Sequence, residues 1–166
     1  MMKVKKIREE FDFNNIPKIH QLVNNVAGMI IVDIKQSVAK GVDLNGSKFK
    51  ALKPSTIRAK RKKGSSTPQK PLMDTHRMVG RGGVGGSQTG MDFTGGTGIY
   101  LKGATRGNNK ANIRISADRE DIARIHNEGE GDMPKREWFG VSKRAIKKLR
   151  TVVDQWIKIN LYMIGK

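Results

Sequence analysis

Two long segments of this chain repeat apolar residues at three- and four-residue intervals, which is the spacing of one face of an α-helix. The segments cover residues 16–40 and 142–163. Their apolar positions are Ile16, Ile19, Val23, Val26, Ile30, Ile34 and Val38 in the first, and Ala145, Leu149, Val152, Val153, Trp156 and Met163 in the second. Gly41 suits the position just beyond a helix end. Each segment therefore predicts a helix with one buried stripe, and Trp156 is expected in the core.

Shorter patterns between these segments predict a small sheet and a third helix. Ile99–Leu101 and Ile113–Ile115 have the composition of strand cores, with 103–110 as the turn between them. Residues 121–128 favour a short helix with Ile122 and Ile125 facing inward. Residues 3–15 alternate loosely and suit a short strand near Phe11. The chain is thus expected to form a single α+β domain over 1–166, with two long helices on a small, mainly antiparallel sheet.

Two irregular regions separate the predicted helices. Residues 42–80 form a basic connecting arm, in which Pro54-Ser55-Thr56 suits the start of a short helix with Ser55 as its cap. Residues 80–116 form a glycine-rich hairpin region, because 11 of the 19 glycines fall between Gly80 and Gly107. Ordering so many glycines is entropically unfavourable. The stretch 80–98 is therefore expected to order only in an assembly.

The charge of the chain is strongly unbalanced. There are 33 Lys and Arg residues against 15 Asp and Glu, which gives a formal net charge of +18. Such an excess indicates a polyanion, an acidic protein surface or an anionic membrane as partner. The sequence has no cysteine, so disulfides and thiolate chemistry are excluded. The first residues lack the apolar core of a signal peptide, and no apolar run reaches the length expected of a membrane span.

The charges are also segregated along the chain. No acid lies between Asp43 and Asp74, where the arm carries Lys48, Lys50, Lys53, Arg58, Lys60, Arg61, Lys62 and Lys63. Conversely, six of the 15 acids lie between residues 118 and 132, namely Asp118, Glu120, Asp121, Glu128, Glu130 and Asp132. Contact between such segments on neighbouring subunits can close a ring. Pairing of the two segments inside one subunit is the alternative that the sequence leaves open.

The segment from Ile125 to Gly140 combines a glycine turn, a proline and an aromatic pair directly before the last predicted helix. Pro134 disfavours helix at Met133, so the chain there is expected to extend or turn. Trp138 and Phe139 are expected to anchor this loop to the core. Arg136 is expected to hold the loop by pairing with a carboxylate.

Three pieces of the chain, in order, resemble the virion-morphogenesis or tail-completion family of Mu-like and related tailed phages. The first is Gly46 with 49–56, which reads Phe-Lys-Ala-Leu-Lys-Pro-Ser-Thr. The second is 71–78, which reads Pro-Leu-Met-Asp-Thr-His-Arg-Met and departs from the family at His76, where Gly is usual. The third is 125–129 followed by 133–140. The residues of the third piece that match the family are His126, Gly129, Pro134, Arg136, Phe139 and Gly140.

The resemblance implies a structural α+β protein of the phage neck or tail end, with no catalytic, cofactor or metal site. It implies a homo-oligomeric ring, most simply a hexamer, that assembles in the host cytoplasm and becomes part of the virion. Its expected partners are other neck, tail-tube or connector proteins, with DNA passing through the lumen and no membrane. The expected assembly interface joins the eight basic residues of the arm to Glu128, Glu130 and Asp132.

Other functions fit parts of the sequence. The basic arm from Lys48 to Lys63 also suits a nucleic-acid-binding module. His126 beside Asn127 suits an HNH-type nuclease, but such a site needs further ligands, and only His20 and His76 remain, without ligand spacing. The glycine cluster lacks the spacing of a phosphate-binding loop. Basic, amphipathic helices also occur at membrane surfaces, although contact with a core explains these stripes more simply.

Overall fold

The computed structural model describes residues 18–73, 99–115 and 120–164. These residues form four helices and one two-stranded antiparallel sheet, so the chain has a mixed α+β fold. The helices are α1 (Ile19–Lys40), α2 (Pro54–Lys62), α3 (Glu120–Glu128) and α4 (Lys143–Ile164), and the strands are β1 (Ile99–Lys102) and β2 (Asn112–Ile115). The predicted strand near Phe11 and the stretch 80–98 lie outside the described residues.

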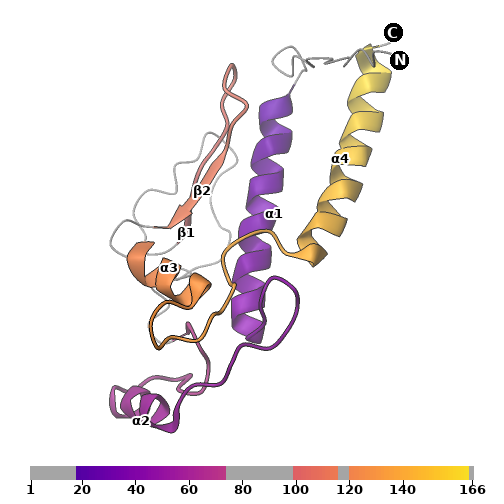
Figure 1. Cartoon of the computed structure of the whole chain (residues 1–166). Helices are drawn as coiled ribbons and strands as arrows, with labels where there is room; N and C mark the ends of the chain where they lie inside the picture. The colour runs from indigo at the N-terminus through magenta and orange to yellow at the C-terminus, as the bar shows by residue number, and fades with distance from the viewer. Residues whose placement is uncertain (1–17, 74–98, 116–119, 165–166) are drawn as a thin grey trace, which may run out of the picture.

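Helix α1 is the centre of the molecule, with the β1–β2 hairpin and α3 on one side and α4 on the other (Figure 1). The long helix α1 ends at Gly41, whose positive φ of 72° suits a residue without a side chain. The Gly41 and Val42 amides donate to carbonyls of the last turn, at Val38 and Ser37. This is the glycine stop that the sequence predicted.

The hairpin packs on α1 through apolar and polar contacts. Strands β1 and β2 pair with Leu101 opposite Ile113, and Leu101 is buried against Ala27 and Ile31 of α1. Asn24 of α1 fixes the hairpin turn, because its side-chain oxygen accepts from the Ala104 amide at 2.7 Å and its amide donates to the Ala104 carbonyl at 2.9 Å. The hairpin is therefore held to the helix at both its strands and its turn.

Helix α4 is held against α1 by a polar cluster that the apolar pattern did not predict. Asp33 of α1 is buried, and its carboxylate accepts from the Ser142 hydroxyl at 2.5 Å and from the Arg144 guanidinium at 2.5 and 2.8 Å. The Ser142 oxygen also accepts from the Ala145 amide at 3.0 Å, so Ser142 caps the N-terminus of α4. The cluster fixes the start of α4 against α1. Arg144 thus has an internal partner, so not all cations of the first turns of α4 face outward.

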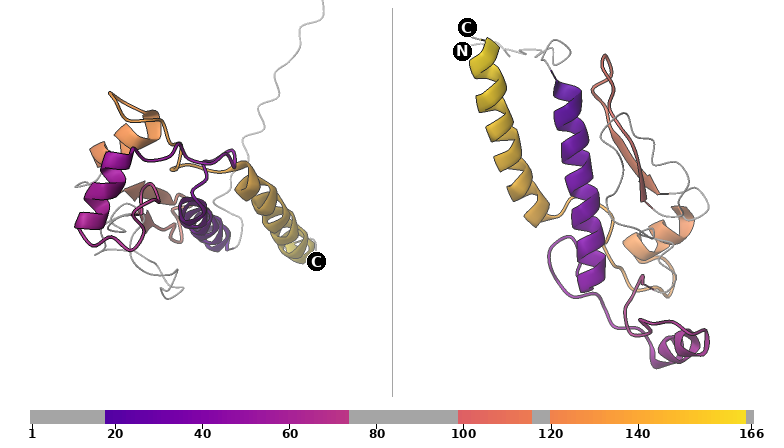
Figure 2. Two further views of the ribbon diagram at one scale, coloured as in Figure 1. Left: turned by 90° about the horizontal axis from the view of Figure 1, so that it is seen from below. Right: turned by 180° about the vertical axis from the view of Figure 1, so that it is seen from behind.

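The burial of two predicted core positions differs from the sequence-based expectation. Trp156 on α4 is only partly buried, whereas Trp138 in the loop before α4 is 0% exposed. In α3 the buried residue is Ala123, and Ile122 is exposed. For Trp156 the cause is that α4 packs mainly against α1, on the side away from the hairpin and α3 (Figure 2). Amphipathic spacing identifies an apolar face but not how much of it a neighbour covers.

Candidate assembly interface

Three segments that are separate in the chain, 49–56, 71–73 and 133–140, contribute to one core cluster, which contains the buried Trp138. Its ring is packed with Ile34, Val38 and Ala123 in the main core cluster. Partly buried residues from the first and second pieces complete the cluster, namely Phe49, Leu72 and Met73. Phe139 lies beside Trp138 with ring centroids 5.6 Å apart. The expectation that these two aromatic residues anchor the loop is confirmed.

Asn127 fixes the course of the loop that contains the aromatic pair. Its side-chain oxygen accepts from the amides of both Trp138 and Phe139, each at 3.0 Å. The backbone of the same helix end contributes another bond, because the Arg136 amide donates to the His126 carbonyl at 2.8 Å. Asn127 therefore has a structural role that closes the loop onto the end of α3.

Two glycines of the third piece sit where a side chain does not fit. Gly129 has a φ of 78°, and a Cβ there would approach the Lys135 amide nitrogen to 2.7 Å. Gly140 has a φ of 155°, and a Cβ there would approach a Leu44 methyl group to 2.7 Å. Leu44 also exchanges backbone hydrogen bonds with this segment, through Glu137 and Lys143. The turn that precedes the first piece is thus joined directly to the third piece.

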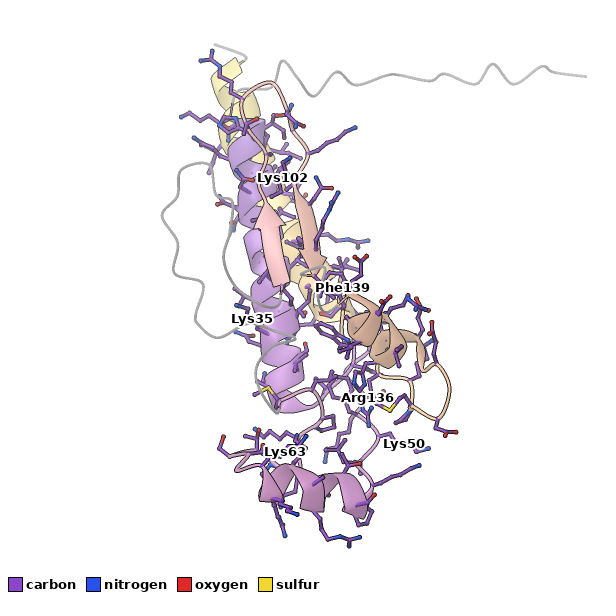
Figure 3. The ribbon with its side chains drawn as sticks, turned by 90° about the vertical axis from the view of Figure 1, so that its left-hand side faces the viewer. Lys35, Lys50, Lys63, Lys102, Arg136 and Phe139 are labelled. Carbon is purple, nitrogen blue, oxygen red and sulfur yellow. The ribbon has the colours of Figure 1, made fainter. Side chains whose placement is uncertain are left out.

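Arg136 is the most deeply buried charged residue of this junction, at 2% exposure. It was expected to pair with a carboxylate, but its guanidinium donates instead to two backbone carbonyls, at Lys50 (3.3 Å) and Pro134 (3.5 Å). Figure 3 shows Arg136 close to Lys50, which belongs to the segment 49–56. Burial lowers the pKa of Arg136 from its usual value. The guanidinium therefore ties the loop after α3 to the segment that leads into α2.

His126 lies beside this arginine and is partly buried, with no hydrogen-bond partner for its Nδ1 atom. Burial lowers the pKa of His126, and the nearby positive charge of Arg136 lowers it further. The histidine is therefore held in its neutral form. Within the described part of the chain, no group of His, Cys, Asp and Glu residues is arranged to hold a metal ion.

The buried His126 should make the fold less stable in acid. Its folded-state pKa lies below the value of about 6.5 expected for the unfolded chain, so the unfolded chain binds the proton first as the pH falls. Below about pH 6.5 the free energy of unfolding should thus fall by up to ~1.4 kcal/mol per pH unit. Urea unfolding of wild type and His126→Gln between neutral and acidic pH measures this. An identical pH dependence in the two proteins would exclude His126 as its source.

Helix α2 presents the basic arm at the end of the molecule away from the hairpin turn (Figures 1 and 3). Its N-terminus differs from the expectation, because Lys53 is the cap and Pro54 the first helical residue, so Ser55 does not cap it. Pro54 suits that position because its missing N–H would have no partner there. Of the eight expected interface residues of the arm, seven are exposed: Lys48, Lys50, Lys53, Arg58, Arg61, Lys62 and Lys63.

Lys60 is the eighth of these residues, and it lies on the buried side of α2. Its ammonium donates to the carbonyls of Lys70 at 2.8 Å and Thr67 at 3.3 Å. Lys60 is buried by the loop that follows α2, which it holds in place. We therefore correct its expected role from interface residue to structural residue. Sequence alone does not distinguish it, since its neighbours Arg61 and Lys62 are of the same kind.

The acidic segment divides in a similar way. Glu130 forms an ion pair with Arg124 of the same chain, whereas Glu128 and Asp132 are exposed. Asp118 lies outside the described residues. Among the described residues other than Lys60, no ion pair joins the basic arm to the acidic segment.

The sequence matches no family model, and no curated protein and no solved structure is significantly similar to it. In the part of the chain that the structure describes, no helix combines the length and apolar character needed to cross a membrane.

Proposed function

We propose that this chain is a structural, non-enzymatic phage protein that forms a ring in the neck or at the tail end and takes part in tail completion or head–tail joining. In this proposal two long helices and a small antiparallel sheet form the body, and the basic arm and glycine-rich loop serve assembly. The partners are further copies of the chain, six in the simplest ring, and a neighbouring neck, tail-tube or connector protein. DNA passes through the lumen. The protein acts in the virion after assembly in the host cytoplasm.

The observation that carries this proposal is the convergence of the three resembling pieces around Trp138. Residues far apart in the chain, such as Phe49, Leu72 and Trp138, belong to one core cluster. A hydrogen bond also joins two of the pieces, because the Arg136 guanidinium donates to the Lys50 carbonyl. Order and spacing alone do not require such a meeting.

The exposed charge supports an assembly role for α2. Its exposed cations include Arg58, Arg61 and Lys62, and the exposed acids of the acidic segment include Glu128 and Asp132. Complementary charges of this kind increase the rate of encounter and set the register of a contact more than they increase its affinity. We therefore assign the arm to steering the chain onto an acidic surface of a neighbouring subunit or connector.

Reversing the exposed charges of the arm should slow assembly and leave the fold intact. The variant changes Arg58, Arg61, Lys62 and Lys63 to Glu and keeps Lys60, because Lys60 supports the loop after α2. Exposed ion pairs contribute about 0–1 kcal/mol each to folding, so the variant should unfold like wild type. Ring formation followed by light scattering, and phage titre after complementation, measure the effect. Wild-type assembly should slow as salt rises, since the Debye length is about 8 Å at 0.15 M.

A matched control is available on the hairpin. Lys102, Arg106, Lys110 and Arg114 are all exposed, and reversing them to Glu gives the same net charge as the arm variant. Only the arm variant should assemble slowly and lose its response to salt. Equal assembly rates and titres for the arm variant and wild type would remove the arm from the proposal.

The same exposed surface also supports nucleic-acid binding as a second candidate. A helix with several unpaired cations on its outer side can follow a phosphate backbone. A nucleic-acid-binding module would hold duplex DNA with an affinity that falls steeply with salt, and the arm reversal would abolish it. A ring subunit would bind DNA weakly at physiological salt. A titration of labelled duplex at several salt concentrations separates the two candidates.

A further inference from the structure

Helix α4 carries more apolar surface than its contact with α1 covers. Ala145 is buried, but Ile146 remains 43% exposed and Ile159 66% exposed. Ile157 is also exposed, and Val153 is only partly buried. Large exposed apolar surfaces on soluble domains indicate interaction sites.

Three of these residues form a continuous stripe. Ile146, Val153 and Ile157 are spaced by seven and four residues, so they follow one another along one side of the helix. Lys143 and Arg150 border this stripe on the side away from α1, by the same helical spacing. Both cations are exposed, and neither has an ion pair among the described residues. The α4 stripe, defined by Ile146, Val153 and Ile157, is thus apolar with a basic edge.

A surface of complementary character lies on the segment from Glu120 to Met133. Ile122 is 41% exposed and Met133 is exposed as well. Exposed acids accompany them on α3 and on the loop that follows it, namely Glu120, Asp121, Glu128 and Asp132. Arg124 on the same helix is paired with Glu130, so the remaining charge of this α3 surface is acidic. With its exposed Ile122 and Met133, the surface matches the α4 stripe in both respects.

The helices that carry the two surfaces lie on opposite sides of α1. Figures 1 and 2 show α4 on one side of α1 and α3 on the other in every view. One subunit therefore cannot bring its own α4 stripe onto its own α3 surface. When two different surfaces join copies head to tail, each growing chain keeps one free surface of each kind at its ends. Further copies therefore add until the ends meet in a ring, or the chain grows as an open filament.

We propose that the α4 stripe of one copy docks on the α3 surface of the next copy, and that this contact holds the ring together. The inference rests on the proposed function, because it names the subunit contact of the proposed ring. The apolar residues provide the affinity of the contact, since water leaves Ile146, Ile157 and Ile122 on docking. The charged edges orient the two surfaces. The arm on α2 then steers encounter, and its loss changes the rate of assembly but not the end state.

Two variants with one defective surface each test the contact. The α4 variant carries Ile146→Glu and Ile157→Glu, which places acids opposite acids. The α3 variant carries Ile122→Gln and Met133→Gln, which removes apolar contact without adding charge. All four residues are exposed in the subunit, so both variants should show the circular dichroism and unfolding of wild type. Each alone should associate at least about tenfold more weakly than wild type.

Mixing the two variants gives a result specific to a head-to-tail contact. The α4 variant keeps an intact α3 surface, and the α3 variant keeps an intact α4 stripe, so the mixture can form one good contact and no second one. Mass photometry should therefore detect a one-to-one heterodimer in the mixture, monomers in each variant alone and rings in wild type. A contact of α4 with α4 would instead leave the α3 variant forming normal oligomers, which would overturn the proposal.

The remaining outcomes separate this inference from the proposed function. Rings formed equally well by the α4 variant and wild type would overturn the α4 contact and leave the ring intact. A wild-type protein that stays monomeric, in a phage whose tails mature without it, would contradict the proposed function itself. The charge-reversal variants Lys143→Glu and Arg150→Glu provide a second reading, because they keep the apolar residues. They should weaken ring formation, and Asp121→Lys with Glu128→Lys should restore it.

Discussion

Replacing Trp138 by alanine should lower the free energy of unfolding by about 3–5 kcal/mol, the range measured for buried aromatic residues. The side chain is fully buried in the main core cluster, against Ile34 and Val38 of α1. Its indole nitrogen donates to the Ala123 carbonyl at 3.4 Å, so the substitution also removes a link between α3 and the loop. Loss of the indole side chain would leave a cavity in the main core cluster. Of the alanine variants at Trp138, Trp156, Asp33 and Asp154, we expect Trp138→Ala to be the least stable.

Trp156→Ala is the matched control, because it removes the same side chain from α4. Trp156 is only partly buried, so its loss should cost about 1 kcal/mol. Chemical unfolding followed by circular dichroism compares the two variants without relying on tryptophan fluorescence. A larger loss in Trp156→Ala than in Trp138→Ala would place the main core between α1 and α4, contrary to the structure.

Asp33→Ala should give the second large effect, with a loss of about 3 kcal/mol, the lower end of the range for breaking a buried charge pair. The carboxylate is buried and receives hydrogen bonds from Ser142 and Arg144. Its removal leaves the Ser142 hydroxyl and the Arg144 guanidinium without their acceptor at the start of α4. Part of the arginine is exposed and can turn to water, which is why we expect the lower end of the range.

Asp154→Ala provides the control for this second prediction, because Asp154 is exposed on the same helix. Its loss should change the free energy of unfolding by no more than about 0.5 kcal/mol. Hydrogen exchange should also show faster exchange at the start of α4 in Asp33→Ala, since that end loses its attachment to α1. Equal stabilities for the Asp33 and Asp154 variants would mean that the polar cluster does not hold α4.

The local signals in the sequence predicted the mixed α+β class of the described residues, but not that α4 packs mainly on α1 rather than on the sheet. Apolar periodicity placed the helices that became α1 and α4, and β-branched residues around 99–101 and 113–115 placed the hairpin. These signals succeed because each depends on residues close together in the chain. Gly41 was predictable for the same reason, since a left-handed residue at a helix end requires glycine.

Burial and polar partners depend on distant residues and were predicted less well. Periodicity does not show how much of a helix face a neighbour covers, so Trp156 was expected in the core, but it is only partly buried. Asp33 interrupts an apolar face as a single carboxylate, and only its contact with Ser142 and Arg144 explains it. Lys60 could not be separated from the other cations of the arm, and the partners of Arg136 are backbone carbonyls that no sequence pattern records.

Electron micrographs of the purified wild-type protein test the central claim most directly. At physiological salt we expect closed rings of uniform diameter, built from one number of subunits, with a central opening. The α4 variant should give single subunits on the same grids. A wild-type protein that remains monomeric at all concentrations and salt conditions would contradict the account of this chain as a ring-forming assembly protein.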